Sequence, residues 1–526
     1  MERIIGGCWN KKRHQSDREE DSVKKNRVFA LITVLLGSLL MGCASGGKKT
    51  DVIRQESTAA AQTDYPDEDE MTITWALFDM NVDCSGMQNE LNQTLKEKGI
   101  PYKIQFENIS VPFETYKDYV NSYVETVKNS RYDIISTGSA QQCYDPYKMM
   151  CEKGMLLSWN DFLQEDTGTA LKNAYPSAVW EAISYKGDIY GLLSPIPYFN
   201  YYLVFNLDYA EKYDIDVEAI TWGNLESALQ KVMNGEKEEH HEAFAALAGK
   251  PEVLLRDYEA TMCELILIDM SQGVPRAENA LYNQEWLEVS RQINDWKNQG
   301  LIPEDQIPAW ESLETGDFLA TGIYSYSEEA AQQQCRAGGV SEKVRLKAVK
   351  IPEFRQSFCG KGSKAAVNAE SRQSEAAMEV LAAIYSDKTL SDALVYGKEG
   401  VNYQIQNGRA IYLDLGVPEV RNIQYQLGNS FLTMPGILDS LSKEEELWNT
   451  AEETRSMLAG FSFELGEKLD KVSQIKTYFT EECGWGIYGE GEAWNVDLEE
   501  KRRKTEQLGI NEIIEEMNSQ LEKWEN

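Results

Sequence analysis

The residue types that most often perform acid–base or nucleophilic chemistry are scarce in this 526-residue chain. It has 3 histidines: His14 is near the N-terminus, and His240 and His241 are adjacent. Such a set cannot supply a His-based catalytic triad or a metal site built from dispersed histidines. The sequence also lacks the G-x-S-x-G, H-E-x-x-H and G-x-x-x-x-G-K-[ST] motifs. We therefore predict no catalytic residue, no metal ligand and no cofactor.

Carboxylates leave one catalytic alternative open. The chain has 86 Asp and Glu against 52 Lys and Arg, for a formal net charge of −34. Two carboxylates can hydrolyse a glycosidic bond when their separation in space is right, and a sequence does not reveal that separation. A glycoside-active enzyme therefore stays an alternative. The same negative charge would repel a phosphate backbone, so we expect no nucleic-acid partner.

The 9 cysteines differ in their surroundings. Cys43 follows the apolar run 28–40, which is preceded by Lys24, Lys25 and Arg27. That run is too short to span a bilayer and is typical of the apolar part of a signal peptide. The seven cysteines after Cys43 show no C-x-x-C and no zinc-like spacing. We interpret those seven as buried small apolar residues rather than as a disulfide framework.

The segment Leu40-Met41-Gly42-Cys43 resembles the bacterial lipobox, in which the cysteine receives a diacylglycerol. The alternative is a buried cysteine after a core helix. We predict that residues 1–42 are a signal peptide and that 43–70 is a flexible linker, because this segment is small, polar and without periodicity. Cys43 would then anchor the protein by lipid to the outer face of the cell membrane. Because residues 1–22 are unusually acidic for a signal peptide, we expect translation to start at Val23.

The body of the protein begins with alternating strands and helices. The expected order is a strand, a helix, a strand, a helix and a strand over 72–78, 87–98, 102–109, 116–127 and 132–136. This alternation predicts a mostly parallel sheet. Ligands of such sheets gather at the carboxyl ends of the strands, which here are followed by the loops Asp79–Asp83 and Thr137–Gln142.

A second set of elements follows, and the length of the chain requires at least two lobes. Strands are expected over 201–205 and 344–351, the segment 315–324 leads into a further strand, and a helix is expected over 374–385. From Glu444 onward the pattern is mostly helical and ends with 508–524. No internal repeat of 20–50 residues is visible, which argues against a solenoid.

Taken in order, these segments resemble the extracellular solute-binding lipoproteins of carbohydrate-uptake ABC transporters. The resemblance runs from Cys43 almost to the end of the chain, and 366–371, 396–403 and 508–524 resemble the subset with a long helical C-terminal extension. Besides the lipobox, the segments that carry it are Tyr132-Asp133-Ile134, Gly154–Asp161, Tyr175–Trp180, Gly187–Gly191, Asn206-Leu207-Asp208, Thr221-Trp222 and Thr315–Tyr324.

The resemblance implies an α/β, two-lobed periplasmic-binding-protein-like (type II) fold. It implies three crossings between the lobes, expected near Pro197–Asn200, Leu319–Ile323 and Ser386–Leu390. Lobe 1 would then comprise 71–198 and 320–387. Lobe 2 would comprise 199–319 and 388–526, including the C-terminal helices.

Sugars need flat aromatic side chains and short polar groups that can donate and accept hydrogen bonds. Asp79 would accept from hydroxyls, Asn81 and Asn200 would orient the ligand, and the aromatic side chains would stack on sugar rings. Each aromatic residue has the alternative of a core or rim position. The predicted ligand-binding residues lie at the strand ends and near the crossings: Asp79, Asn81, Thr137, Ser139, Tyr198, Asn200, Tyr201, Trp310, Tyr324 and Tyr326.

The function implied by the resemblance is capture of an oligosaccharide outside the membrane by hinge closure, and delivery to the permease subunits of an ABC transporter. We expect a monomer that is not an enzyme. The acidic charge favours a neutral glycan over an anionic one. The alternatives are a surface-anchored glycoside-active enzyme and a sensor that presents its closed form to a membrane kinase. The sequence names no sugar, and a peptide or another polar solute stays open.

Overall fold

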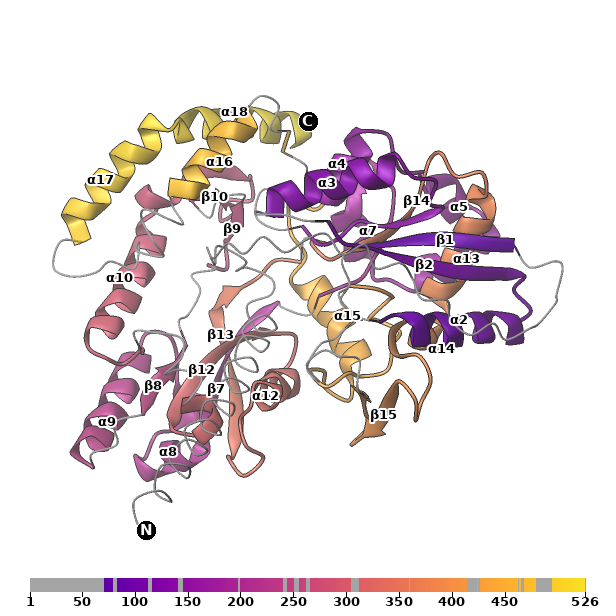
Figure 1. Ribbon diagram of the computed structural model, residues 1–526. Coiled ribbons are helices and arrows are strands. Elements are labelled where there is room, and N and C mark those ends of the chain that lie inside the picture. Colours follow the sequence, from indigo (N-terminus) through magenta and orange to yellow (C-terminus); the bar gives the residue numbers. More distant parts are fainter. Residues whose placement is uncertain are drawn as a thin grey trace, which may run out of the picture.

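Two α/β lobes lie side by side in the computed structural model (Figure 1). The structure describes residues 71–525 except for 79–82, 112–115, 141–144, 197–198, 240–243, 250–254, 262–264, 304–311, 359, 414–422, 424–425, 462, 465–467 and 479–493. The predicted signal peptide, linker and lipidated Cys43 lie outside the described residues. No helix in the described part of the chain has both the length and the apolar character needed to span a bilayer.

Lobe 1 is built on a sheet in which β1 is parallel to β2 and β3, and β14 is antiparallel to β3 and β6. Its strand order in the described chain is β2 (Tyr102–Ile109), β1 (Met71–Phe78), β3 (Ile134–Ser136), β14 (Lys364–Val367) and β6 (Leu192–Leu193). The connecting helices α2 (Ser85–Glu97) and α3 (Tyr116–Lys128) are amphipathic. In α2, Met87, Leu91 and Leu95 recur every four residues and are buried. The predicted β-α-β-α-β order is therefore confirmed.

Further helices complete lobe 1 (Figure 1). They are α4 (Pro146–Glu152), α5 (Asn160–Gln164), α6 (Thr169–Asn173), α7 (Ser177–Ile183), α13 (Ser374–Ser386), α14 (Lys388–Tyr396) and α15 (Lys443–Glu453). Two small hairpins pair β4 (Ser184–Tyr185) with β5 (Asp188–Ile189), and β15 (Tyr403–Gln406) with β16 (Arg409–Tyr412).

Lobe 2 is built on a second sheet, whose central strand β7 (Asn200–Asn206) is buried along its whole length. The strand order is β13 (Leu346–Arg355), β7, β12 (Phe318–Ser325) and β8 (Ala245–Ala248). At the end of β7, Asn206 accepts a hydrogen bond from the Asp208 amide and so caps the helix α8. The helices of this lobe include α8 (Leu207–Lys212), α9 (Leu225–Glu238), α10 (Gln284–Asn298) and α12 (Glu328–Ala337).

The C-terminal helices pack on lobe 2 through a small antiparallel sheet. This sheet contains β9 (Tyr258–Thr261), β10 (Ile266–Asp269) and β11 (Arg276–Asn279), and the helices are α16 (Leu469–Thr477), α17 (Trp494–Gln507) and α18 (Ile510–Glu525). The Asn518 side chain on α18 bonds both the amide and the carbonyl of Ala277 on β11. Ile513, Met517 and Leu521 of α18 are buried in the core of lobe 2. This packing makes α18 part of that lobe.

The second and third predicted crossings are wrong. Leu319–Ile323 lies within β12, which pairs with β7 inside lobe 2. Ser386–Leu390 joins α13 to α14, and both of these helices contribute to the core of lobe 1. The chain instead passes from lobe 1 to lobe 2 between β6 and β7, returns between β13 and β14, and leaves lobe 1 again after α15. Residues 320–355 therefore belong to lobe 2, and the described residues between 388 and 453 belong to lobe 1.

Two cysteine side chains agree with the interpretation of the thiols as core residues. Cys335 on α12 is buried, and burial raises the pKa of its thiol to about 12. Cys151 on α4 is half-buried, and burial likewise raises its pKa to about 12. Both thiols are protonated at neutral pH, which makes them poor nucleophiles.

Candidate functional site

The two lobes are joined by chain segments that pack against one another. We call residues 199–200, 355–358 and 454–456 the hinge segments. The Gln356 amide donates to the Phe199 carbonyl at 2.6 Å, and the Phe358 amide donates to the Thr454 carbonyl at 2.8 Å. The rings of Phe199 and Phe358 meet edge to face, with centroids 5.3 Å apart. Backbone bonds and buried rings thus hold the connections between the lobes together.

A carboxylate from lobe 2 lies beside the hinge segments. Glu259 on β9 accepts a hydrogen bond from the Ser456 hydroxyl, and Ser357 is a further hydrogen-bond partner. Burial raises the pKa of Glu259, although the nearby charges of Lys361 and Arg355 act in the opposite direction. Glu259 is thus a desolvated carboxyl group at the point where the lobes meet.

The carboxyl end of β3 provides the lobe 1 side of this junction. Thr137 is fully buried and accepts a hydrogen bond from the Lys364 amide at 3.1 Å, so its side chain ties β3 to β14. Ser139 is half-exposed. The Ala140 amide donates to the carbonyl of Lys361 at 2.8 Å, which places the exposed Lys361 beside the loop. A Cβ on Gly138 would lie 2.9 Å from the Phe78 ring, so this turn requires glycine.

The predicted residues in β7 and β12 lie on the lobe 2 side. Asn200 and Tyr201 are both buried, and Tyr324 is half-buried. The Tyr201 ring packs on Tyr324 at 5.0 Å and on Phe354 at 5.6 Å between centroids. Its hydroxyl lies over Gly322, where a Cβ would be only 2.0 Å away. Tyr201 therefore contributes to the core of lobe 2, the alternative stated above for each aromatic residue.

Tyr326 also has a structural role. It is buried, its hydroxyl donates to Asp439 at 3.2 Å, and the same hydroxyl accepts from the Ser440 amide at 3.2 Å. Burial raises the pKa of Tyr326 well above its usual value. These bonds tie the end of β12 to lobe 1.

Four other predicted residues lie outside the described residues: Asp79, Asn81, Tyr198 and Trp310.

Sequence reasoning missed the polar groups that meet at the junction. Glu259, Ser357, Lys361 and Ser456 come from β9 and from the connections between the lobes. Charged and hydroxyl side chains are common in exposed segments, so their types alone carried no signal. Only the pairing of distant segments brings these four together.

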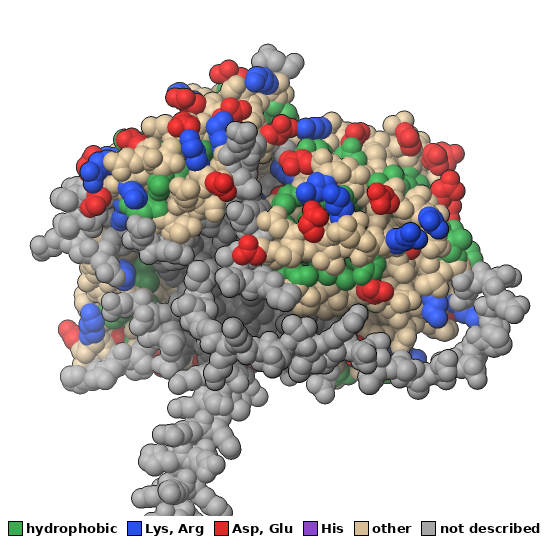
Figure 2. All heavy atoms as spheres, turned by 45° about the horizontal axis from the view of Figure 1, so that its top comes forward, with side chains coloured by type: hydrophobic (Ala, Val, Ile, Leu, Met, Phe, Trp, Pro, Cys, Tyr) green, Lys and Arg blue, Asp and Glu red, His purple; other side chains and the backbone are tan. Residues whose placement is uncertain are grey.

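The junction offers a carboxylate, an ammonium group and several hydroxyls, which can bind a polar ligand by accepting and donating hydrogen bonds. Among the described residues, no group of three or more His, Cys, Asp or Glu side chains is placed to hold a metal ion. On the face shown in Figure 2, Lys and Arg side chains lie among the more numerous Asp and Glu.

No family model and no curated protein sequence matches the chain. Solved structures do match it. The N-glycan transport solute binding protein NgtS from Streptococcus pneumoniae is 17% identical, with a TM-score of 0.65 over 86% of this chain and 99% of that protein.

Two further structures match with similar coverage. NgtS in complex with Man5GlcNAc is 18% identical, with a TM-score of 0.56 over 86% of this chain and 98% of that one. The ABC-transporter substrate binding protein FusA of S. pneumoniae, in complex with kestose, is 13% identical, with a TM-score of 0.55 over 86% and 99%. At these identities the likeness shows the fold. The chain has the two-lobed α/β architecture of these solute-binding proteins, as the sequence predicted.

Proposed function

We propose that the protein is the substrate-binding lipoprotein of an ABC transporter and that it captures an oligosaccharide at the junction of its lobes. The observation that carries this proposal is the likeness of fold over 86% of the chain to NgtS and FusA, whose structures hold Man5GlcNAc and kestose. Those proteins are transport proteins and not enzymes. By analogy, binding without cleavage is the activity assigned to this chain.

The ligand would be held by groups from both lobes. Lobe 1 contributes Ser139 and Lys361, and lobe 2 contributes Glu259 and Tyr324. Asp79, Asn81, Tyr198, Asn200 and Trp310 stay predicted ligand contacts. Thr137, Tyr201 and Tyr326 are buried and in this proposal hold the surrounding backbone in place.

Closure about the hinge segments would enclose the ligand. A ligand that touches both lobes binds the closed form more tightly than the open form. That difference in affinity shifts the equilibrium between the open and closed forms toward the closed one. The net charge of −34 opposes the approach of anionic sugars, so the ligand proposed is neutral. A signal peptide would export the monomer, and lipid on Cys43 would hold it at the outer face of the cell membrane, where the closed form would deliver sugar to the permease subunits.

A melting-temperature screen with neutral oligosaccharides tests the proposal. Anything that binds only the native state stabilises it, by about 2.7 kcal/mol when the ligand concentration is 100 times the dissociation constant. We expect one or more oligosaccharides to raise the melting temperature and to be recovered intact by mass spectrometry. Release of cleaved sugar would instead support the enzyme alternative. The absence of any shift across neutral oligosaccharides would contradict the proposed ligand class.

A further inference from the structure

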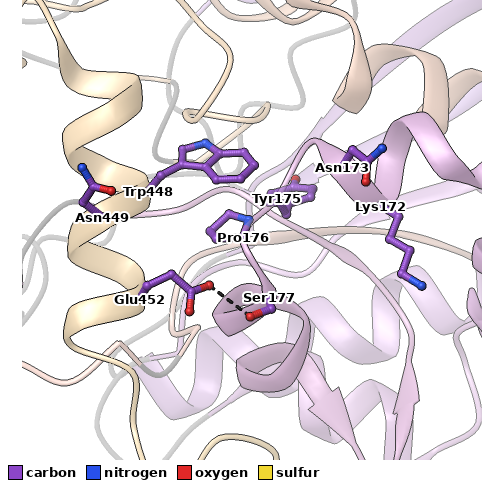
Figure 3. Close-up of a pocket in the computed structure, with 8 residues that line it drawn as sticks. All are labelled: Lys172, Asn173, Tyr175, Pro176, Ser177, Trp448, Asn449 and Glu452. Carbon is purple, nitrogen blue, oxygen red and sulfur yellow. Dashed lines mark hydrogen bonds between the residues drawn. The ribbon is translucent and has the colours of Figure 1, made fainter.

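A second pocket lies on the surface of lobe 1, between the end of α6, the start of α7 and the helix α15 (Figure 3). Its volume is about 270 Å³, slightly below the range of about 300–1,000 Å³ common for drug-sized ligands. The other end of α7 reaches the lobe junction, because a Cβ on Gly360 would lie 3.0 Å from the Ala182 carbonyl. A seven-residue helix is about 10 Å long. The residues that line the pocket differ from those of the junction, although Arg455 of the hinge segments bonds Ser177 and Glu452 at its edge.

The Trp448 ring forms one wall of this pocket, and the buried Tyr175 ring lies behind the surface. Trp448 on α15 is half-buried, and its ring meets the Phe431 ring edge to face at 5.8 Å. Tyr175 also meets Phe431 edge to face, at 6.0 Å, and its hydroxyl donates to the Leu193 carbonyl at 2.7 Å. Both rings are thus fixed against the same phenyl group before any ligand arrives, which lowers the entropic cost of binding.

Polar groups line the rest of the pocket. Lys172, Asn173 and Asn449 are exposed, and their side chains make no hydrogen bond within the described part of the protein. Glu452 is already engaged: it pairs with Arg455, and it accepts from the Ser177 hydroxyl and the Ala178 amide, each at 3.1 Å. Figure 3 shows the Glu452–Ser177 bond and the Trp448 ring reaching from α15 toward Pro176. The two amides each offer a donor and an acceptor to a ligand.

We propose that this pocket binds one neutral pyranose ring. A pyranose has an apolar C–H face, which suits an aromatic ring, and hydroxyls that both donate and accept, which suit free side-chain amides. The net charge of −34 disfavours an anion. A purely apolar ligand could not form hydrogen bonds with the side-chain amides of Asn173 and Asn449. The inference rests on this pocket alone and does not need the lobe junction to bind sugar.

Fluorine NMR of the full chain labelled with 5-fluorotryptophan tests the proposal. Methyl α-D-mannopyranoside and N-acetyl-D-glucosamine serve as probes, and Trp448→Phe assigns the Trp448 resonance. We expect a saturable shift of that resonance with at least one probe. The Trp524 resonance, from an exposed side chain on α18, is the internal control and stays in place.

A double variant, Asn173→Ala with Asn449→Ala, tests the polar contacts. Losing a neutral hydrogen bond of about 1 kcal/mol weakens binding about fivefold, so the pair together should weaken it by more. Asn298→Ala, which removes an exposed amide on α10, should leave the titration unchanged. No saturable Trp448 shift with either probe would overturn the proposal, as would a shift that the double variant leaves intact. The melting-temperature screen responds to binding at either site, so it is repeated with the double variant, in which a remaining shift reports the lobe junction and each site can fail alone.

Discussion

Two of the regions in which the lobes touch have opposite character. In the hinge segments, contact is made by backbone hydrogen bonds and by the buried rings of Phe199 and Phe358. In the second region, which we call the C-terminal contact, the link is made by exposed side chains. Lys186 of lobe 1 pairs with Glu464 at 2.6 Å, and Gln520 of α18 bonds the backbone of Glu464 on both sides.

This difference separates a permanent connection from an exchangeable one. Buried rings and backbone bonds are costly to break, because each broken bond leaves a desolvated group behind. Exposed ion pairs exchange readily with water. We infer that the hinge segments persist through any movement of the lobes, whereas the C-terminal contact can open.

The largest expected effect is at Phe358, which is 3% exposed. Phe358→Ala should lower the free energy of unfolding by about 3–5 kcal/mol, because it removes a buried ring and leaves a cavity. Urea unfolding followed by circular dichroism measures this change. Val401→Ala, at a side chain that is 63% exposed, is the control and should change little. A loss below about 1 kcal/mol at Phe358 would contradict the role given to the hinge segments.

Lys443 sharpens the comparison, because it forms a buried ion pair where Lys186 forms an exposed one. Its Nζ lies 3.8 Å from Asp439 and donates to the Thr433 hydroxyl at 2.7 Å, and burial lowers its pKa to about 8. Asp392, Lys388 and Glu444 are the other charges near it.

The sign of the pH effect follows from that pKa. Between pH 8 and the ordinary lysine value of about 10.4, the unfolded chain holds the proton that the folded protein has lost. The stability contribution of Lys443 should therefore rise with pH across this window, by up to about 3 kcal/mol. Subtracting the unfolding free energy of Lys443→Met from that of the wild type at each pH isolates the contribution of Lys443. A difference that does not change between pH 8 and about 10.4 would contradict this prediction.

An intermediate effect is expected at Glu259, on the hinge side of the junction. Glu259→Ala removes a desolvated hydrogen-bond acceptor and leaves the Ser456 hydroxyl without that acceptor, so it should weaken oligosaccharide binding by about 1–3 kcal/mol, or about 5- to 150-fold. Calorimetric titration with a sugar from the melting screen measures this. Glu464→Ala at the C-terminal contact is the matched control. Equal losses in the two variants would argue against a direct contact between Glu259 and the ligand.

The smallest effect is expected for the exposed ion pair itself. Lys186→Met should change the free energy of unfolding by less than about 1 kcal/mol, and salt should reduce the change further. Unfolding curves at low and high salt test this. A larger change that salt does not alter would mean that the C-terminal contact is as permanent as the hinge.

The sequence predicted the features that depend on neighbouring residues and missed those that depend on segments distant in the chain. The first five elements of lobe 1 were predicted because each has its own periodicity and its neighbours follow in order. The assignment of β12 to a lobe failed because it depends on pairing with β7, more than 100 residues away, and periodicity contains no information on partners. Glu259 was missed for the same reason. Its surroundings come from residues 355–361 and 456, far from β9 in sequence.

Small-angle X-ray scattering with and without a saturating oligosaccharide tests the central claim most directly. The account predicts that the sugar with the largest melting shift lowers the radius of gyration, because the lobes close about the hinge segments, and that the sugar is recovered uncleaved. An unchanged radius of gyration at saturation, or a shortened sugar, would contradict it.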